Sequence, residues 1–93
     1  MVTHKSEAYR QPPGPFYIRM GRLIRSCRES RGFSQEAVGN RLQVTAAMVG
    51  YWEAGSRRIP ADRIPDLCRV LRCSPLWLMG MNEKGQELLE DAT

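Results

Sequence analysis

The sequence is poor in the side chains from which metal sites and nucleophilic active sites are built. It holds one histidine, His4, and three cysteines, Cys27, Cys68 and Cys73, none of which has the Cys-x-x-Cys spacing. A structural zinc site needs four ligands, and an odd cysteine count without a secretion signal favours reduced thiols over disulfides. No glycine-rich phosphate loop follows a strand pattern. We therefore expect no metal, no cofactor and no enzymatic activity.

Long hydrophobic runs are also missing. No apolar run approaches the roughly 20 residues that a membrane-spanning helix needs. The first residues, MVTHKSE, are not followed by the apolar stretch of a signal peptide. The 93 residues leave room for one small domain and exclude a regulator with its own sensing domain. We therefore expect one cytoplasmic domain that does not contact a membrane.

Basic residues outnumber acidic ones, and they are unevenly spread. The chain has 14 Lys and Arg against 10 Asp and Glu, and twelve of the basic residues are arginine. Residues 82–93 carry a net charge of −3, so residues 1–81 carry +7. An arginine-rich domain suits the DNA backbone, because each neutralised phosphate releases condensed counterions. Charge alone fits equally well a basic protein with no nucleic-acid role.

Proline and periodicity divide the chain into an arm, a helical domain and a tail. The run Pro12-Pro13-Gly14-Pro15 predicts that residues 1–15 form an extended arm. This arm is either a loosely held terminus, the more common behaviour, or a segment that lies in a DNA groove or against a partner. Residues 16–80 show helical periodicity and no strand pattern, and residues 81–93 form an acidic tail. The predicted fold class is all-α.

Five short helices are predicted in the central segment. The first begins at Phe16 and ends near Gly32. Ser34 and Thr45 are the predicted N-caps of the second and third helices, and the third ends before Gly55. The fourth predicted helix follows Pro60 and has Pro65 in its first turn. Its inward-facing residues are Ile64, Leu67, Cys68 and Leu71. The fifth has Ser74 as its N-cap and Pro75 at its first position, and it ends at Gly80.

The second and third predicted helices are joined by a tight turn, which is the pattern of a helix-turn-helix motif. Gly39 supplies the small residue needed where the two helices approach, and Val44 supplies an apolar anchor for the turn. Val49 and Trp52 form an inward-facing pair on the third helix. The residues left outside are Ala46, Ala47, Gly50, Tyr51 and Ala54.

These residues resemble the helix-turn-helix of the Cro and phage-repressor family of prokaryotic transcriptional regulators. The motif carries Ser34-Gln35, Val38-Gly39, Val44-Thr45 and Val49-Gly50-Tyr51-Trp52-Glu53-Ala54-Gly55, and the flanks carry Met20-Gly21, Ile24-Arg25, Cys27-Arg28, Gly32-Phe33, Arg58, Pro60, Leu67, Leu71, Ser74 and Trp77-Leu78. The resemblance covers residues 20–80. It implies a compact five-helix, lambda-repressor-like DNA-binding domain with its motif at about residues 34–54.

The resemblance also implies roles for individual residues. The implied DNA contacts are Ser34, Gln35, Thr45, Ala46, Ala47, Gly50, Tyr51, Ser56, Arg57 and Arg58. An ion pair between Arg28 and Glu53 is implied to hold the docking angle of the third helix, the alternative being that Arg28 is a solvated surface charge. The implied dimer interface is Trp77, Leu78, Met79 and Met81. Alternatively Trp77 and Leu78 fill the core, and of the two Leu78 is expected to point inward.

Two features depart from the family pattern. Gln43 stands where the family usually has glycine with a positive φ, which costs roughly 1–2 kcal/mol if that geometry is kept. Where the family usually offers polar side chains to the bases, this chain has Ala46, Ala47 and Gly50. Alanine contacts only thymine methyl groups. Either this helix sits deep in the major groove, with Thr45 and Tyr51 adding polar contacts and DNA shape adding to the readout, or its smooth face meets a protein.

The sequence therefore predicts a DNA-binding transcriptional regulator. We expect a dimeric repressor that inserts its third helix into the major groove of a near-palindromic operator. The first alternative is the antitoxin of a toxin pair, or another protein-binding adaptor that keeps the same fold. A second alternative is an accessory protein that bends DNA, such as an excisionase.

Overall fold

The computed structural model describes residues 12–81, so residues 1–11 of the predicted arm and residues 82–93 of the predicted tail lie outside the described residues. The elements are α2 (Pro15–Ser30), α3 (Gln35–Leu42), α4 (Ala46–Ala54), the 3-10 turn η1 (Ala61–Arg63), α5 (Ile64–Leu71) and α6 (Pro75–Leu78). The predicted all-α fold with five helices is confirmed. None of the helices within this described part combines the length and the hydropathy required of a membrane span.

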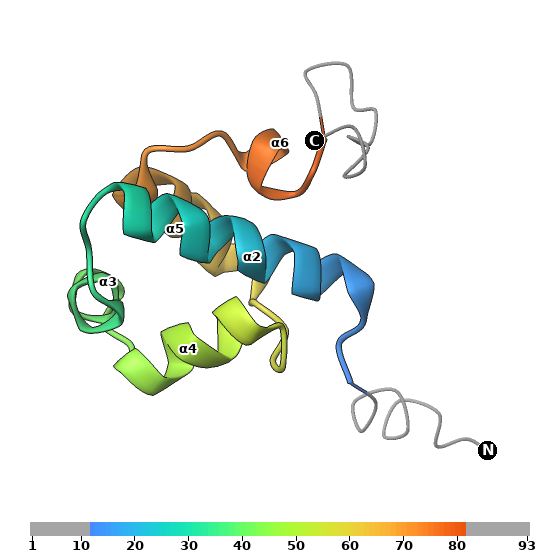
Figure 1. Ribbon diagram of the computed structural model, residues 1–93, viewed down its shortest axis with the longest axis horizontal. Helices are drawn as coiled ribbons and strands as arrows, with labels where there is room; N and C mark the ends of the chain where they lie inside the picture. The colour runs from blue at the N-terminus through green and yellow to red at the C-terminus, as the bar shows by residue number, and fades with distance from the viewer. Residues whose placement is uncertain (1–11, 82–93) are drawn as a thin grey trace.

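The helices are arranged around α2, the longest of them. Figure 1 shows α4 running along one side of α2, with α3 at one end of α4 and α5 behind α2. α4 packs against both α2 and α3, and α6 packs against α2 and α5. In this view α6 lies on the opposite side of α2 from α4. The motif helices and the last helix therefore occupy different faces of the molecule.

Side-chain caps fix where the short helices begin, as the sequence predicted. The Ser34 Oγ accepts the N–H of Ala37 at 3.0 Å, and the Thr45 Oγ1 accepts the N–H of Met48 at 3.0 Å. The Ser74 hydroxyl likewise accepts two N–H groups at the start of α6. Because α3 and α4 have only 8 and 9 residues, they are too short to be stable as isolated helices. Caps and tertiary packing together hold them.

Two boundaries differ from the prediction. α2 begins at Pro15, which the sequence analysis placed in the extended arm. Proline is tolerated at the first position of a helix, because the N–H it lacks would have no partner in the helix there. The turn η1 before α5 was not predicted, and the guanidinium of Arg63 at its end donates to the carbonyl oxygen of Leu42 at 2.7 Å. That contact ties η1 to the last turn of α3.

The core draws on every α-helix and on the loop after α4. The inward-facing positions predicted on the third helix are buried, as are three of the four predicted on the fourth helix, while Ile64 is half-buried. The buried apolar residues are Met20, Ile24, Cys27, Val38, Leu42, Val49, Trp52, Ile59, Leu67, Cys68, Leu71 and Leu78. Packing in this core buries one side of α4 and leaves the opposite side facing solvent.

The three cysteines are free thiols. Cys27 and Cys68 are buried, as expected for cysteines on apolar helical positions, and the Cys27 Sγ donates to the carbonyl oxygen of Leu71 at 3.3 Å. Burial, together with the neighbouring thiols of Cys27 and Cys68, raises the pKa of Cys73 to about 12. The Cys73 thiol therefore stays protonated at neutral pH, where it packs and does not act as a nucleophile.

Gln43, in the turn between α3 and α4, is a non-glycine residue with a positive φ. Its φ of 60° and ψ of 41° are left-handed, as the departure from glycine at this position anticipated. A Cβ in this conformation costs roughly 1 kcal/mol, so we expect Gln43→Gly to raise the free energy of unfolding by about 1 kcal/mol in urea denaturation. Gln43→Ala keeps the Cβ and is the control. An equal gain for both variants would contradict the explanation from φ.

Candidate nucleic-acid interface

α4 presents one side to solvent and buries the other. Val49 and Trp52 point into the core, while Ala47, Tyr51 and Ala54 are exposed. Ala46 and Gly50 on the same outer side are half-buried, and Thr45, which caps the helix, is exposed. The large side chain of this outer face is Tyr51, 44% exposed. We call this surface, Thr45, Ala46, Ala47, Gly50, Tyr51 and Ala54, the outer face of α4.

Two glycines allow the backbone of α4 and its turn to approach neighbouring helices. A Cβ on Gly39 would lie 2.6 Å from the carbonyl oxygen of Val44, so Gly39 is needed beside the turn that leads into α4. A Cβ on Gly21 of α2 would lie 2.5 Å from the carbonyl oxygen of Glu53 and would also meet the carbonyl oxygen of Trp52. The sequence analysis anticipated the approach at Gly39 and not the one at Gly21. The two close contacts set how far α4 stands out from the body.

An ion pair joins the end of α2 to the end of α4. The Arg28 Nε donates to the Glu53 Oε2 at 2.5 Å, and the Arg28 Nη2 donates to the Glu53 Oε1 at 3.1 Å. The Arg28 Nη1 also donates to the carbonyl oxygen of Phe33 at 2.8 Å. The Arg28 and Glu53 side chains are 11% and 4% exposed, so Arg28 is not the solvated charge of the alternative interpretation. The hydrogen bond to Glu53 raises the pKa of Arg28 above its usual value.

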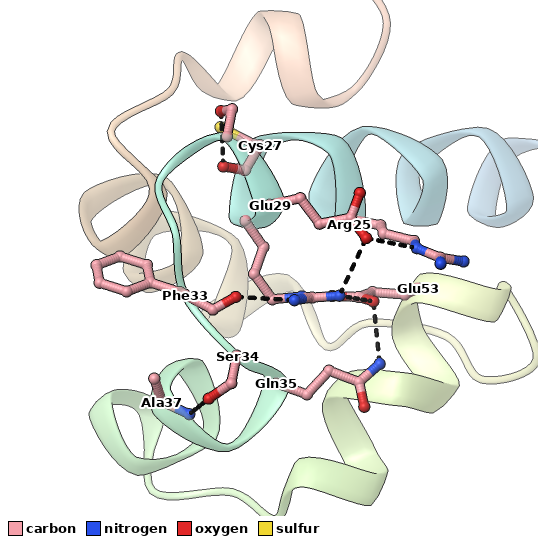
Figure 2. Close-up of polar contacts among 10 residues, drawn as sticks. Arg25, Cys27, Glu29, Phe33, Ser34, Gln35, Ala37 and Glu53 are labelled. Atoms are coloured by element: carbon pink, nitrogen blue, oxygen red, sulfur yellow. Dashed lines mark hydrogen bonds and ion pairs between the residues drawn. The ribbon is translucent and has the colours of Figure 1, made fainter.

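Gln35, at the first position of α3, connects to this pair. Its Nε2 donates to the Glu53 Oε1 at 3.1 Å, and Figure 2 shows its carboxamide nitrogen directed at the Glu53 carboxylate. The Gln35 amide also lies 3.5 Å from the position that a Cβ on Gly50 would take. Gln35 therefore fills the space beside Gly50 and orients the end of α4. It lies beside the N-terminus of α3, where backbone N–H groups favour an anion.

The loop after α4 folds back over the last turn of the helix. Gly55 is left-handed, with a φ of 73°, and ends α4. Both the backbone N–H and the hydroxyl of Ser56 donate to the carbonyl oxygen of Tyr51, at 3.0 and 3.2 Å. The guanidinium carbon of Arg57 stands 4.7 Å from the centroid of the Tyr51 ring, and Arg58 is exposed. Two cations and Tyr51 are thus gathered at one end of the outer face of α4.

Several arginines counted in the basic charge serve internal contacts. Arg31 donates to the carbonyl oxygens of Leu71 and Arg72 at 2.9 and 3.0 Å, closing the C-terminal end of α5. Arg25 and Arg69 pair with Glu29 and Asp66 on their own helices, and the guanidinium of Arg41 lies 4.5 Å from the ring centroid of Phe33. The charge of the sequence therefore overstates the number of arginines that stand ready for phosphates.

Of the four residues predicted at a dimer interface, Leu78 does not lie on the surface. Leu78 is fully buried in the core of its own chain, which corrects its place in the predicted interface and agrees with the expectation that it points inward. Leu78 is buried while the neighbouring Trp77 is exposed because α6 packs one side against α2 and α5. Trp77 is 37% exposed, and Met79 and Met81 are half-buried. Trp77 also borders an open cavity of about 320 Å³ lined by Arg31 and Arg72.

Comparison with known proteins agrees with this geometry. Residues 19–76 match a family model described as a helix-turn-helix domain. The chain is 31% identical over 77 residues to an uncharacterized HTH-type transcriptional regulator of Sinorhizobium fredii, a match that covers 83% of this chain and 54% of the relative. The chain thus spans about half the length of the relatives that it matches in sequence.

Two solved structures have the same arrangement of helices. The P22 c2 repressor in complex with a synthetic operator superposes with a TM-score of 0.61 at 29% identity, over 63% of this chain and 89% of the repressor. The restriction-modification controller protein C.AhdI from Aeromonas hydrophila superposes with a TM-score of 0.63 at 27% identity, over 67% of this chain and 90% of C.AhdI. The similarity therefore extends beyond the motif to the surrounding helices.

Proposed function

Because the chain belongs to the Cro and phage-repressor family of helix-turn-helix transcriptional regulators, we propose that it binds double-stranded DNA through the outer face of α4. The observation that carries the proposal is the way α4 is held. Its inner side is buried, its end is fixed by the Arg28–Glu53 pair, and Thr45, Ala47, Tyr51 and Ala54 of its outer face are exposed within the described residues 12–81. A helix held in this way fits the major groove.

Phosphate contacts would surround this helix and set its position. Arg58 lies in the loop after α4 and is exposed, and Ser34 and Gln35 lie at the N-terminus of α3. Helix N-termini and arginine side chains are the groups that usually hold phosphates. The Ser34 hydroxyl accepts the N–H of Ala37, so its own O–H is left to donate to a phosphate, whereas the Ser56 hydroxyl already donates to the carbonyl oxygen of Tyr51.

Base contacts would be few and largely apolar. The methyl groups of Ala46 and Ala47 can touch only the methyl group of thymine, and Gly50 offers no side chain. The polar groups left for base edges are the hydroxyls of Thr45 and Tyr51, of which Thr45 already caps α4. We infer that the preference for one DNA sequence over another is set by a few base pairs near Tyr51 and by DNA shape elsewhere.

We further propose that the chain acts as a dimeric repressor at a near-palindromic operator. The solved P22 c2 repressor was crystallised with a synthetic operator, and a domain of this size gains phosphate contacts by pairing on two half-sites. Trp77, which is exposed, and the half-buried Met79 and Met81 are the apolar residues from which a dimer contact would be built. α6, which carries Trp77, lies across α2 from α4, so pairing through α6 would leave α4 open to a duplex.

The salt dependence of duplex binding tests the proposal. If four phosphates are neutralised by a dimer, affinity should fall by about 100-fold between about 50 and 200 mM salt. Fluorescence anisotropy with a labelled promoter fragment measures this, and a scrambled duplex of equal length gives the non-specific reference. A flat salt response would falsify phosphate-led binding.

Two substitutions separate the roles of the loop and of the helix. We expect Arg58→Ala to weaken binding about fivefold on preferred and scrambled duplexes alike, because a phosphate contact carries no sequence information. We expect Tyr51→Ala to change the preference at one or two base pairs, by about tenfold, because Tyr51 faces the base edges. The measurement is affinity for a panel of single base-pair variants. Equal effects of the two variants on every duplex would refute this division of roles.

The second candidate function is binding of a protein, as in an antitoxin or an adaptor. The specific observation in its favour is the smooth outer face of α4, where Ala47 and Ala54 are exposed beside Gly50. In that case a partner encoded beside this chain would protect Ala47 and Tyr51 of α4 from hydrogen exchange or labelling. Duplex DNA would then give neither a salt-dependent nor a sequence-dependent signal.

A further inference from the structure

Tyr51 is the large side chain on the outer face of α4, the surface where base recognition is proposed. Its neighbours on the outer face of α4 are Ala47, Gly50 and Ala54, none of which can limit the motion of a tyrosine ring. A partly exposed side chain with such small neighbours can sample more than one rotamer, and holding one rotamer in a complex costs entropy. A tyrosine that reads a base pair from this position therefore benefits from a group that restricts its ring.

The loop after α4 supplies such a group. Ser56 bonds to the carbonyl oxygen of Tyr51 through its N–H and its hydroxyl, which turns the chain back toward the helix. The turn is itself confined, since a Cβ on Gly55 would lie 2.6 Å from the Cα of Ile18 on α2. The next residue, Arg57, is thereby placed with its guanidinium carbon 4.7 Å from the Tyr51 ring centroid. Within residues 12–81, Arg58 makes no such ring contact, although it is adjacent and exposed.

The contact has the chemistry of a cation–π stack. A planar guanidinium over a tyrosine ring is attracted by the electron-rich ring face, with about 0.5–1 kcal/mol at an exposed site. An ammonium group is a compact, strongly hydrated charge and does not replace a flat stack. Arg57 therefore restricts the rotation of the Tyr51 ring. In the same contact, Tyr51 restricts how far the Arg57 guanidinium can extend toward a phosphate.

We propose that Arg57 is a positioning residue for Tyr51, and that the two act together to set sequence preference. The proposal rests on the proposed DNA-binding function and assigns Arg57 a role different from that of Arg58. Arg58 contributes charge that any duplex can use, whereas Arg57 contributes mainly through the orientation of the tyrosine hydroxyl. The competing possibility is that Arg57 leaves the ring on binding and holds a phosphate as Arg58 does.

Conservative substitutions distinguish these roles, because lysine keeps the positive charge and loses the planar group. The variants are Arg57→Lys, Tyr51→Leu and the double substitution, with Arg58→Lys as the matched control at the neighbouring position. Each is measured against the preferred duplex, its single base-pair variants and a scrambled duplex. Ring-current shifts of the Arg57 side-chain protons, measured by NMR in the free full chain and in Tyr51→Leu, report the stack independently of DNA.

We expect Arg57→Lys to keep affinity for the scrambled duplex within about twofold and to reduce discrimination at the base pairs read by Tyr51 by about threefold to fivefold. Arg58→Lys should leave discrimination unchanged. In the Tyr51→Leu background, Arg57→Lys should have no further effect on discrimination, because the ring is gone. The ring-current shifts should be present in the free chain and absent from Tyr51→Leu.

Three results overturn the proposal. One is an Arg57→Lys variant that matches Arg58→Lys on every duplex, and another is additive loss of discrimination in the double variant. The third is the absence of ring-current shifts in the free chain. Failure of the proposed function is separately recognisable, since the unmodified chain would then bind no duplex in a sequence-dependent way, and the inference would fall with it.

Discussion

Gly21→Ala is expected to lower the free energy of unfolding by about 3 kcal/mol. The added Cβ would lie 2.5 Å from the Glu53 carbonyl oxygen and would also collide with that of Trp52. Both obstacles are backbone atoms in the last turn of α4, which cannot move aside as a flexible side chain would. Relief of the clash requires α2 and α4 to separate, and that opens the core around Trp52.

Gly50→Ala is the matched control, because it adds the same methyl group in the middle of a helix. The nearest atoms to its Cβ would be those of the Gln35 side chain, at 3.5 Å, which is an ordinary contact. Alanine favours a helix over glycine, so this variant should gain about 0.5–1 kcal/mol. Urea denaturation followed by circular dichroism measures both variants. If Gly21→Ala is as stable as the unmodified chain, the close approach of α2 and α4 is wrong.

Glu53→Ala is expected to cost about 3 kcal/mol of stability, because it leaves the largely buried Arg28 guanidinium without the carboxylate that accepts two of its hydrogen bonds. Glu53 accepts hydrogen bonds from Arg28 and from Gln35, so its removal frees donors on two helices. The end of α4 would then lose the contact that joins it to α2. The measurement is again the free energy of unfolding, and duplex binding should weaken with it.

Two further variants make this prediction specific. Glu29→Ala removes an exposed carboxylate that pairs with Arg25 on the same helix and lies 3.9 Å from the Arg28 Nη2, and such exposed pairs are worth about 0.5 kcal/mol or less. Replacing Arg28 and Glu53 together by methionine should recover much of the lost stability, because no unpaired charge is left buried. A double variant as unstable as Glu53→Ala would contradict the attribution to charge.

The positions of the helices were predictable because their signals are local. Ser34, Thr45 and Ser74 lie directly before the helices that they cap, and each cap is formed within three residues of chain. The inward pair Val49 and Trp52 follows from helical spacing alone. Pro15 was placed wrongly because the same residue suits an extended arm and the first position of a helix.

The uses of the arginines were not predictable in this way. Arg31 closes the end of α5, Arg63 ties η1 to α3, and Arg57 stacks on Tyr51, yet all three look alike as basic residues in polar surroundings. Each contact joins positions that only folding brings together, as for Arg31 and Leu71, 40 residues apart. A long cationic side chain carries no local signal that says which carbonyl, ring or phosphate it will reach.

The amino-acid order by itself determined the class of fold, the residues of the motif and the family to which the chain belongs. Caps, glycines and apolar spacing act over a few residues, and so they can be read along the chain. Only the tertiary structure decided that Gly21 is a contact point, that Arg31 closes the end of α5 and that Arg63 ties η1 to α3. Those outcomes depend on how helices distant in sequence pack, which is a property of the whole core.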